Sequence, residues 1–354
     1  MIIVNARFLT QPISGVQRYG IEISKELKKL YKDEILFLTP KNILHHEVAK
    51  EINARIIGRH IGYIWEQWDL PLYLKSVGKP LLLNFGNIAP LLYRNQITTI
   101  HDIMFYNYNG YSFKKIVWAY RLLVPQVVRR SIHILTVSEY SKNEICNKFH
   151  LSLSDVSVIY SSYNKKMSKI INCDSLRIQH YFFTLSSCTE TKNLILLLQA
   201  FTLLAYEYPD IKLYIAGKVS EKQFLERGWG KYLQNSNIVL LGRVSDEELI
   251  KYYSNAIAFV FPSLSEGFGL PPMEAQGCGC PAILSNATCL PEIYKNSVLY
   301  CDPHDEKDLS DKMKMVIEDK TLAEMLVNKG FENMHYFSWE KNAYKLSKII
   351  EQYI

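Results

Sequence analysis

Ser263-Leu264-Ser265-Glu266-Gly267-Phe268-Gly269-Leu270-Pro271-Pro272-Met273-Glu274-Ala275 is the most informative stretch of this 354-residue chain. The apolar run 256–261 before it predicts a buried strand. A short helix is expected over residues 272–276, because proline is tolerated at a helix start, where its missing N–H would have no partner. The order strand, glycine loop and helix is typical of an α/β domain with a parallel sheet.

Two glutamates, Glu266 and Glu274, frame this stretch. We expect Glu266 in the loop and Glu274 in the first turn of the helix. The backbone N–H groups of the loop and the positive end of the helix dipole favour a phosphate there. The carboxylates themselves do not bind phosphate, but they accept hydrogen bonds from the hydroxyls of a ribose or a sugar ring. The pattern therefore predicts a nucleotide-sugar site whose phosphate contacts come from Gly267, Phe268, Gly269 and Leu270.

The composition is that of a soluble globular protein long enough for two domains. Hydrophobic residues make up 48% of the chain and charged residues 21%, and no apolar run is long enough to predict a membrane-spanning helix. The chain begins with an apparent strand rather than a signal peptide, so we expect a cytoplasmic protein. Seven scattered cysteines predict reduced thiols, and no His, Cys or Asp cluster predicts a bound metal.

Positive charge is concentrated in the first half of the chain. Residues 1–165 carry 21 Lys and Arg against 12 Asp and Glu, whereas residues 166–354 carry 20 against 23. A basic first half predicts an anionic partner. No groove-reading motif predicts nucleic-acid binding, so a membrane surface or a phospholipid-linked acceptor is the better hypothesis.

Apolar runs alternate with amphipathic segments along the chain, which predicts an α/β fold with parallel sheets. The alternation is interrupted at residues 160–179, a polar stretch that we interpret as an interdomain linker. We therefore expect one domain over residues 1–165 and another over 166–338, followed by a helix over 339–354. The expected strands cover 2–5, 35–38, 81–84, 98–101, 133–137, 156–159, 181–185, 212–216, 237–240, 257–261, 282–284 and 298–300. The other expected helices cover 17–31, 65–77, 113–130, 139–149, 192–206, 220–234, 246–253, 306–319 and 322–336.

The stretch from Ser263 to Ala275 closely resembles the signature of glycosyltransferase family 4, and matches to this family extend over essentially the whole chain. The resemblance implies the GT-B architecture of retaining enzymes, with two facing Rossmann-like domains, a cleft between them, and a C-terminal helix that crosses back to the first domain. It implies that the first domain binds the acceptor and the second the nucleotide sugar. Within the family, the chain is similar to mannosyltransferase-like enzymes of bacterial polysaccharide, lipopolysaccharide and O-antigen biosynthesis.

Three further motifs of the first half resemble the family. Gly15 lies in a match to its glycine loop and would let the backbone approach a donor phosphate or acceptor sugar, although it could be an ordinary loop glycine. His101-Asp102 resembles the motif whose histidine approaches the donor sugar, with Asp102 as the residue that orients His101 or as a helix cap. Ser138 lies in a strand-end match, where its hydroxyl either caps the next helix or borders the donor site.

The diphosphate of a donor needs cations, and here the chain departs from the family pattern. The resemblance places Lys192 at the family's phosphate-binding lysine, but Thr191 stands where arginine is usual and Ser186 where glycine is usual. Lysine replaces a bidentate guanidinium only as a point charge. Either Arg243 contributes from a neighbouring strand end, or the leaving group is stabilised less, or the chain is catalytically impaired.

Two aromatic segments of the basic half allow different interpretations. Residues 104–130 are dense in aromatic and basic residues, and they form either a core-facing stripe with a solvated basic face or a surface toward lipid. Trp65-Glu66-Gln67-Trp68 begins an expected helix and is similar to the mannosyltransferase-like family members. The role of this second segment stays open at the level of sequence.

Taken with the resemblance, these features predict a retaining hexosyltransferase. It would move a hexose, with mannose favoured, from a nucleoside-diphosphate sugar, with GDP-mannose favoured, to a lipid-linked saccharide acceptor at the inner face of the membrane, in cell-surface polysaccharide synthesis. His101, Glu266 and Lys192 are the expected catalytic residues, and no metal is expected to take part. A sugar-nucleotide epimerase of the same fold, an inactive nucleotide-sugar-binding subunit and, less favoured because the chain is short, a glycan phosphorylase are the alternatives.

Overall fold

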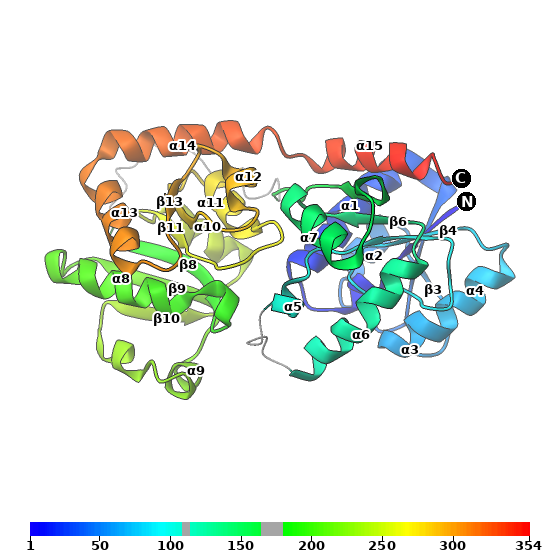
Figure 1. The fold of residues 1–354 in the computed structure, drawn as a ribbon, viewed down its shortest axis with the longest axis horizontal. Coiled ribbons are helices and arrows are strands. Elements are labelled where there is room, and N and C mark those ends of the chain that lie inside the picture. Colours follow the sequence, from blue (N-terminus) through cyan, green and yellow to red (C-terminus); the bar gives the residue numbers. More distant parts are fainter. Residues whose placement is uncertain (108–113, 164–179) are drawn as a thin grey trace. The chain divides into compact units, whose positions relative to one another are not determined.

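Two separate parallel sheets organise the computed structural model, which describes residues 1–107, 114–163 and 180–354. Unit 1 contains the described residues up to Ser161 together with Phe337–Ile354, and unit 2 contains those of Ser162–Tyr336. Figure 1 labels the elements of both units. The predicted α/β fold with parallel sheets is confirmed.

Unit 1 is built on a seven-stranded parallel sheet with the order β3-β2-β1-β4-β5-β6-β7. β1 and β4 are entirely buried, because helices cover both faces of such a sheet. The strand order reverses between β1 and β4, and ligands of open α/β sheets bind at the carboxyl ends of the strands at such a switch point. The strands are β1 (Ile2–Asn5), β2 (Ile35–Thr39), β3 (Arg55–Ile56), β4 (Leu81–Asn84), β5 (Gln96–Thr99), β6 (His133–Thr136) and β7 (Val156–Val158).

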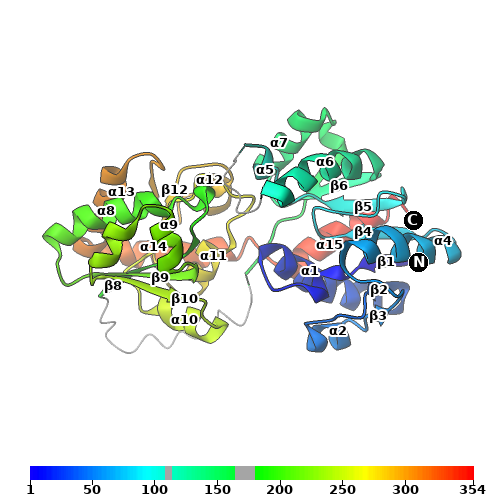
Figure 2. The ribbon, with the colours of Figure 1, turned by 90° about the horizontal axis from the view of Figure 1, so that it is seen from below.

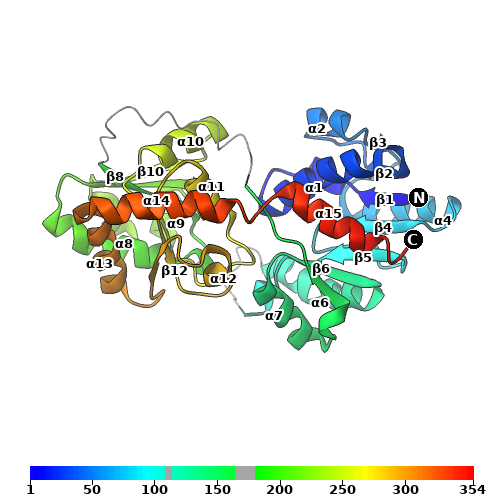
Figure 3. The same cartoon turned by 90° about the horizontal axis from the view of Figure 1, so that it is seen from above.

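The helices of unit 1 include one that comes from the end of the described chain. Helix α15 (Trp339–Ile350) packs on α1 (Gly15–Tyr31), as Figure 3 shows. Tyr31 Oη lies 3.4 Å from the Ser347 carbonyl, and the ring centres of Tyr19 and Trp339 are 5.7 Å apart. The predicted return of the last helix to the first domain is confirmed. The other helices are α2 (His46–Glu51), α3 (Gly62–Ile64), a π-helical turn (Trp65–Asp69), α4 (Leu70–Ser76), α5 (Met104–Asn107), α6 (Lys114–Arg130) and α7 (Glu139–Phe149).

Unit 2 contains a six-stranded parallel sheet with the order β10-β9-β8-β11-β12-β13. Figure 2 labels β8, β9, β10 and β12 of this sheet. Its strand order reverses between β8 and β11, which makes the carboxyl ends of these strands the expected ligand position. The strands are β8 (Tyr181–Ser187), β9 (Lys212–Lys218), β10 (Ile238–Gly242), β11 (Phe259–Phe261), β12 (Ala282–Ser285) and β13 (Leu299–Cys301).

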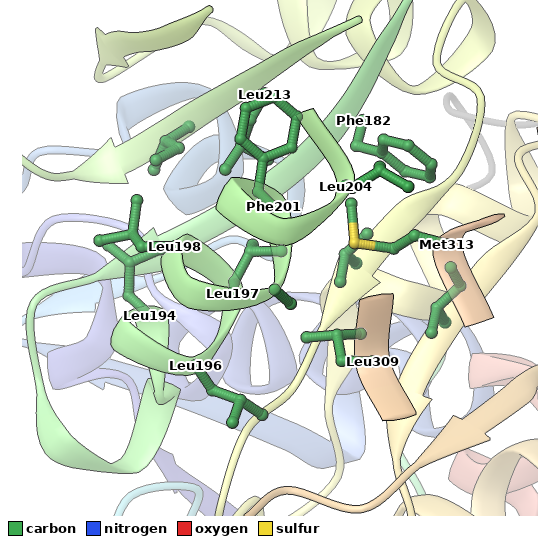
Figure 4. Packing of buried hydrophobic residues seen from close by; sticks show 14 of the residues in the cluster. Phe182, Leu194, Leu196, Leu197, Leu198, Phe201, Leu204, Leu213, Leu309 and Met313 are labelled. Carbon is green, nitrogen blue, oxygen red and sulfur yellow. The ribbon is translucent and has the colours of Figure 1, made fainter. Parts of the chain in front are cut away.

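Helices α8 and α13 hold much of the core of unit 2. Leu197, Phe201 and Leu204 of α8 are buried together with Leu309 and Met313 of α13 (Figure 4). Burial of such side chains contributes roughly 1.5–3 kcal/mol each. The helices of unit 2 are α8 (Leu194–Glu207), α9 (Glu221–Glu226), α10 (Asp246–Ser254), α11 (Leu270–Gly277), α12 (Leu290–Tyr294), α13 (Glu306–Glu318) and α14 (Lys320–Met334).

Several local expectations differ from the structure. The helix expected over 220–234 is interrupted at Gly228: it ends as α9, and a separate 3-10 turn follows over Gly230–Gln234. β3, α2, α5 and α12 were not expected, because each is too short to show a period. Much of the expected linker 160–179 and the centre of the aromatic segment 104–130 lie outside the described residues.

The break at Gly228 has a simple backbone cause. Its φ of +73° lies in the left-handed region, which ends an α-helix and which glycine adopts without steric cost.

Among the described residues, no helix is both long enough and apolar enough to cross a bilayer. The described cysteines are free and buried, as expected for packing residues, and this includes Cys278 and Cys280.

Candidate functional site

The loops that follow β8 and β11 meet at the switch point of the unit 2 sheet. β8 and β11 are neighbouring parallel strands, so both loops leave the same edge. The Leu264 amide donates to the Thr191 carbonyl at 2.8 Å and ties the two loops together. Asn193 strengthens this link, because its side-chain amide donates to the Pro262 carbonyl at 3.1 Å. The local backbone is therefore fixed before any ligand arrives.

Lys192 and Glu266 form an ion pair at this position. Lys192 lies in a 3-10 turn (Glu190–Lys192) after β8, and its Nζ is 2.6 Å from Oε1 of Glu266 in the loop after β11. The Lys192 Nζ also lies 5.0 Å from the centre of the Phe261 ring. The Lys192 side chain is 28% exposed and that of Glu266 is 9% exposed, so the pair lies at a boundary that a ligand can reach. The structure thus brings two of the three predicted catalytic residues together.

A third loop, after β12, holds the backbone of Glu266. The Glu266 amide donates to Thr288 Oγ1 at 3.1 Å, and the Cys289 thiol donates to the Glu266 carbonyl at 3.2 Å. Thr288 has a φ of +52°, which is unusual for a β-branched residue and marks a position that the surroundings enforce. Burial raises the pKa of the Cys289 thiol well above its usual value, so the thiol stays protonated and able to donate. Thr288 and Cys289 were not predicted, because they belong to no motif.

Glu274 lies further along α11 than the sequence indicated. The helix begins at Leu270 rather than at residue 272, so Glu274 is in its second turn and not in its first. Leu270 can start the helix because Gly269 caps it with a φ of +80°, where an added Cβ would lie 2.8 Å from Leu290. Glu274 is 5% exposed. Desolvation raises the pKa of the buried Tyr294 phenol well above its usual value, and the charges of Cys289, Glu266 and Glu274 add to this rise.

Of the residues predicted to cradle a phosphate, Gly267, Phe268 and Gly269 lie in the loop before α11, and Leu270 is the first residue of that helix. Pro271 and Pro272 supply no N–H groups, so the first turn of α11 has fewer donors than an ordinary helix N-terminus. The Tyr294 hydroxyl donates to the Gly269 carbonyl and anchors the end of this loop. Phe268 is buried.

The cations near the β8 loop differ from the family pattern. Thr191 is 6% exposed, and its Oγ1 lies 3.4 Å from the Thr189 hydroxyl, so this position presents no charge. Arg243 is exposed after the edge strand β10, which is separated from β8 by β9. The charge of Arg227 reaches the β8 loop, because it partly opposes the rise that burial causes in the pKa of the Cys188 thiol. Arg227 was not predicted, since it lies outside the matched motifs.

The other candidate residues belong to unit 1 and lie at helix starts or after strands of its sheet. Gly15 is the exposed first residue of α1. Ser138 is fully buried and caps α7, because its hydroxyl accepts from the Ser141 amide at 3.1 Å. Asp102 accepts from the Met104 amide at 3.1 Å and therefore caps α5. The capping interpretation accounts for Ser138 and Asp102, and it leaves their relation to a donor as a prediction.

His101 is buried after β5 and held from two sides. Its Nε2 lies 3.0 Å from the Phe85 carbonyl, and its ring packs edge-to-face on Tyr19 at 5.0 Å. Because a carbonyl can only accept, we place the imidazole proton on Nε2. Desolvation lowers the pKa of His101 to about 4, so the imidazole is neutral near pH 7. Among the described residues, no group of three His, Cys, Asp or Glu is arranged to hold a metal ion.

Comparison with known proteins identifies the family. The sequence profile described as "Glycosyl transferases group 1" matches residues 177–333. The O-antigen chain mannosyltransferase RfbU of Salmonella typhimurium is 30% identical, over 89% of this chain and 90% of that protein. The O-antigen chain mannosyltransferase B of Escherichia coli is 28% identical, over 95% of this chain and 97% of that protein.

Solved structures show the same fold at low sequence identity. HepE of Anabaena, in complex with UDP-glucose, has a TM-score of 0.76 at 15% identity and matches 99% of both chains. Sucrose-phosphate synthase of Thermosynechococcus elongatus has a TM-score of 0.73 at 16% identity and matches 99% of this chain and 98% of its own. The predicted GT-B fold class and the resemblance stated from the sequence are confirmed. The chain belongs to the glycosyl transferases group 1 family and is a glycosyltransferase.

Proposed function

We propose that this glycosyltransferase moves a hexosyl unit, with mannose favoured, from a nucleoside-diphosphate sugar to a hydroxyl of a lipid-linked saccharide in cell-surface polysaccharide synthesis. The two mannosyltransferase relatives, which match nearly the whole chain, support mannose and an O-antigen acceptor. The observation that carries the proposal is the Lys192–Glu266 pair at the switch point of the unit 2 sheet.

In the proposed reaction, the bond between the anomeric carbon and the phosphate oxygen breaks, and its electron pair leaves with the diphosphate. The acceptor oxygen bonds to the anomeric carbon on the same face, and its proton passes to the departing phosphate. Lys192 and the backbone before α11 stabilise the negative charge that develops on the diphosphate. The loss of one such group typically costs ~3 kcal/mol of transition-state stabilisation. Retention of the anomeric configuration follows the family resemblance.

Each acidic residue has a separate role in the proposal. Glu266 accepts from donor-sugar hydroxyls, and its neighbour Lys192 turns toward the phosphate when a donor is bound. Glu274 accepts from the ribose hydroxyls. Positive charge comes from Lys192 and the helix end, so the proposed transfer requires no metal. GDP-mannose is the favoured donor, and the HepE complex with UDP-glucose makes a UDP-linked sugar the second choice to test.

A panel of sugar nucleotides tests this proposal. The purified protein is incubated with GDP-mannose, UDP-glucose and other donors, with and without a saccharide acceptor and with or without EDTA, and products are identified by mass spectrometry. We expect transfer from GDP-mannose that EDTA does not change. An altered sugar nucleotide formed without acceptor would indicate an epimerase, and tight donor binding without turnover on any acceptor would indicate a binding subunit.

Two variants then separate the roles of the acids. Glu274→Ala is expected to weaken donor binding about tenfold or more, because a charged hydrogen bond to the ribose is lost. Calorimetry measures this change in affinity. Glu266→Gln is expected mainly to lower kcat. Glu324→Gln, which changes an exposed acid of α14 in the same unit, is the control. Parental rates in both Glu266→Gln and Glu274→Ala would show that the site is assigned wrongly.

Unit 1 also offers a surface that supports the proposed membrane contact. Ile64, Trp68 and Leu72 follow one another at intervals of four along the helical segment from α3 to α4, and they are 62%, 58% and 52% exposed. Exposed Arg59 and Lys75 flank this stripe. Apolar side chains beside basic ones are typical of a surface that binds anionic lipid.

Vesicle sedimentation tests the membrane contact. The parent is expected to sediment with vesicles that contain anionic lipid, and Trp68→Ser is expected to reduce the bound fraction. Tyr206→Ser removes a side chain of α8 that is 92% exposed and serves as the matched control in unit 2. Equal sedimentation of the parent and Trp68→Ser would remove this part of the proposal.

A further inference from the structure

A small polar pocket lies at the switch point of the unit 1 sheet. It has a volume of about 30 Å³, which is room for about two water-sized groups. The carboxyl ends of β1 and β4 form its floor, and the start of α1 after Gly15 forms one wall. Its polar lining consists of Asn5, Arg7, Gln11, Gln17, Glu66 and the backbone of Gly86.

Glu66 is the unusual member of this lining. It comes from the π-helical turn and is 1% exposed. Its Oε1 accepts from Asn5 Nδ2 at 2.7 Å and lies 3.1 Å from Arg7 Nε, whereas its Oε2 has no hydrogen-bond partner among the described residues. Burial raises the pKa of Glu66, and Arg7 opposes this rise. A buried oxygen without a partner is costly, so it indicates a group that donates to it when a ligand is present.

A hydrogen-bonded ladder across three strands holds Glu66 in place. The Asn5 amide also donates to Asn84 Oδ1 at 3.1 Å, and the Asn84 amide donates to Gln96 Oε1 at 3.2 Å and Thr98 Oγ1 at 3.3 Å. These side chains lie on β1, β4 and β5 and are buried. A buried network of satisfied hydrogen bonds holds its members in one arrangement. The chemistry that it positions is the carboxylate of Glu66.

The remaining lining fits a sugar hydroxyl better than an anion. The Glu66 carboxylate, 3.1 Å away, balances the charge of Arg7, whose guanidinium also lies 4.4 Å from the centre of the Tyr63 ring. The buried Arg7 Nε makes no hydrogen bond among the described residues, so it offers a donor beside the Glu66 acceptor, as a hydroxyl requires. The amides of Gln11 and Gln17 are 2.8 Å apart at the pocket and offer both donors and acceptors. A volume of about 30 Å³ admits one hydroxyl or hydroxymethyl group and leaves the sugar ring outside.

We propose that this pocket is a subsite for the acceptor saccharide, in which Glu66 accepts a hydrogen bond from one acceptor hydroxyl. The proposal rests on the proposed function and names the part of unit 1 that recognises the acceptor. Glu66 is a binding residue in this role, and Asn5 and Arg7 are positioning residues that act through it. The tetrapeptide Trp65-Glu66-Gln67-Trp68, whose role the sequence left open, then contains an acceptor-binding group.

Steady-state kinetics with Glu66→Gln tests the subsite. The KM for the acceptor is expected to rise about 10-fold to 100-fold, because the pocket loses a charged acceptor of hydrogen bonds. The KM for the donor and the affinity for the sugar nucleotide are expected to stay at parental values. Glu22→Gln, on α1 in the same unit and 3.9 Å from Lys25, is the matched control.

A second variant guards against a folding defect. Arg7→Met combined with Glu66→Leu removes both charges and leaves neither one buried without its partner, so the unit is expected to fold. This double variant should bind the donor normally and lose acceptor-dependent turnover. A lower melting temperature with an unchanged acceptor KM, in either variant, would show that Glu66 is only a structural partner of Arg7.

Failure of the proposed function is recognised separately. If the parent binds no sugar nucleotide, the proposed function is wrong, and the subsite is then tested by direct binding of an α-linked mannose disaccharide in saturation-transfer NMR. Binding to the parent that Glu66→Gln weakens would support the subsite. Equal binding to both, or binding to neither, would overturn it.

Discussion

Each unit places one cation beside one carboxylate at the switch point of its own sheet, and the two pairs are held differently. In unit 2, Lys192 and Glu266 come from loops, and the lysine side chain is 28% exposed. In unit 1, the side chains of Arg7 and Glu66 are 13% and 2% exposed, and Glu66 is fixed by a ladder of strand residues. A flexible ammonium can exchange a carboxylate for a phosphate, whereas a buried guanidinium is suited to hold its partner still. The difference indicates a pair that rearranges and a pair that positions.

The stability of the two units should differ most when the carboxylates are removed. Glu66→Ala leaves Arg7 buried without a partner and is expected to lower the unfolding free energy of unit 1 by about 3–5 kcal/mol. Glu266→Ala leaves a lysine that can turn into water, so the loss in unit 2 is expected to be about 1 kcal/mol. Hydrogen exchange of the β1 and β8 amides measures each unit separately. Equal losses of unfolding free energy in the two units would contradict the proposed difference between the two pairs.

The effect on catalysis should instead be large for the Lys192–Glu266 pair of unit 2. Lys192→Ala is expected to lower kcat about 100-fold to 1,000-fold, because a preorganised positive charge at the leaving group is lost. The exposed Lys307, at the start of α13, provides the matched control Lys307→Ala. Both are measured by transfer from the best donor of the panel at saturating donor and acceptor. A Lys192→Ala enzyme with parental kcat would shift the leaving-group role to another cation, with Arg227 the next to test.

Acid should weaken unit 1 through His101. Its folded-state pKa of about 4 is below the unfolded value of about 6.5, so the unfolded chain binds more protons between these values. Stability is therefore expected to fall as the pH is lowered from about 6.5 to 4, by up to about 3 kcal/mol from this group. His101→Gln keeps an N–H for the Phe85 carbonyl and should flatten the slope. Burial also lowers the pKa of His133, so part of the slope of stability against pH is expected to remain in His101→Gln. An unchanged slope in His101→Gln would show that His101 is not the titrating group.

The smallest expected effect concerns the cap of α7. Ser138→Ala removes the acceptor for the Ser141 amide and should destabilise unit 1 by about 1 kcal/mol. Ser138→Asp restores an acceptor at the cap and serves as the comparison in thermal unfolding. If Ser138→Ala instead raised the KM for the donor without changing stability, the donor-binding interpretation of this residue would hold.

Local patterns predicted much of the fold and part of the candidate site. α7 was expected over the residues that it occupies, because its cap, apolar period and flanking strands agree. Lys192 and Glu266 were recognised because each lies in a contiguous motif. Glu66 was not assigned, since its partner Asn5 is 61 residues away in the chain and only the fold brings them together. The turn that contains Glu274 was misplaced, because the left-handed Gly269 starts the helix earlier than the two prolines suggested.

The return of α15 to unit 1 has a consequence for how the chain matures during synthesis. The helix covers Tyr19 with Trp339, yet all of unit 2 is translated between these two residues. On the ribosome, the nascent first sheet is complete long before the helix that seals it emerges. Domains generally fold in the order in which they are made. Here the earlier domain must wait with an uncovered helix face until the later one has been made, and chaperones have that interval in which to bind it.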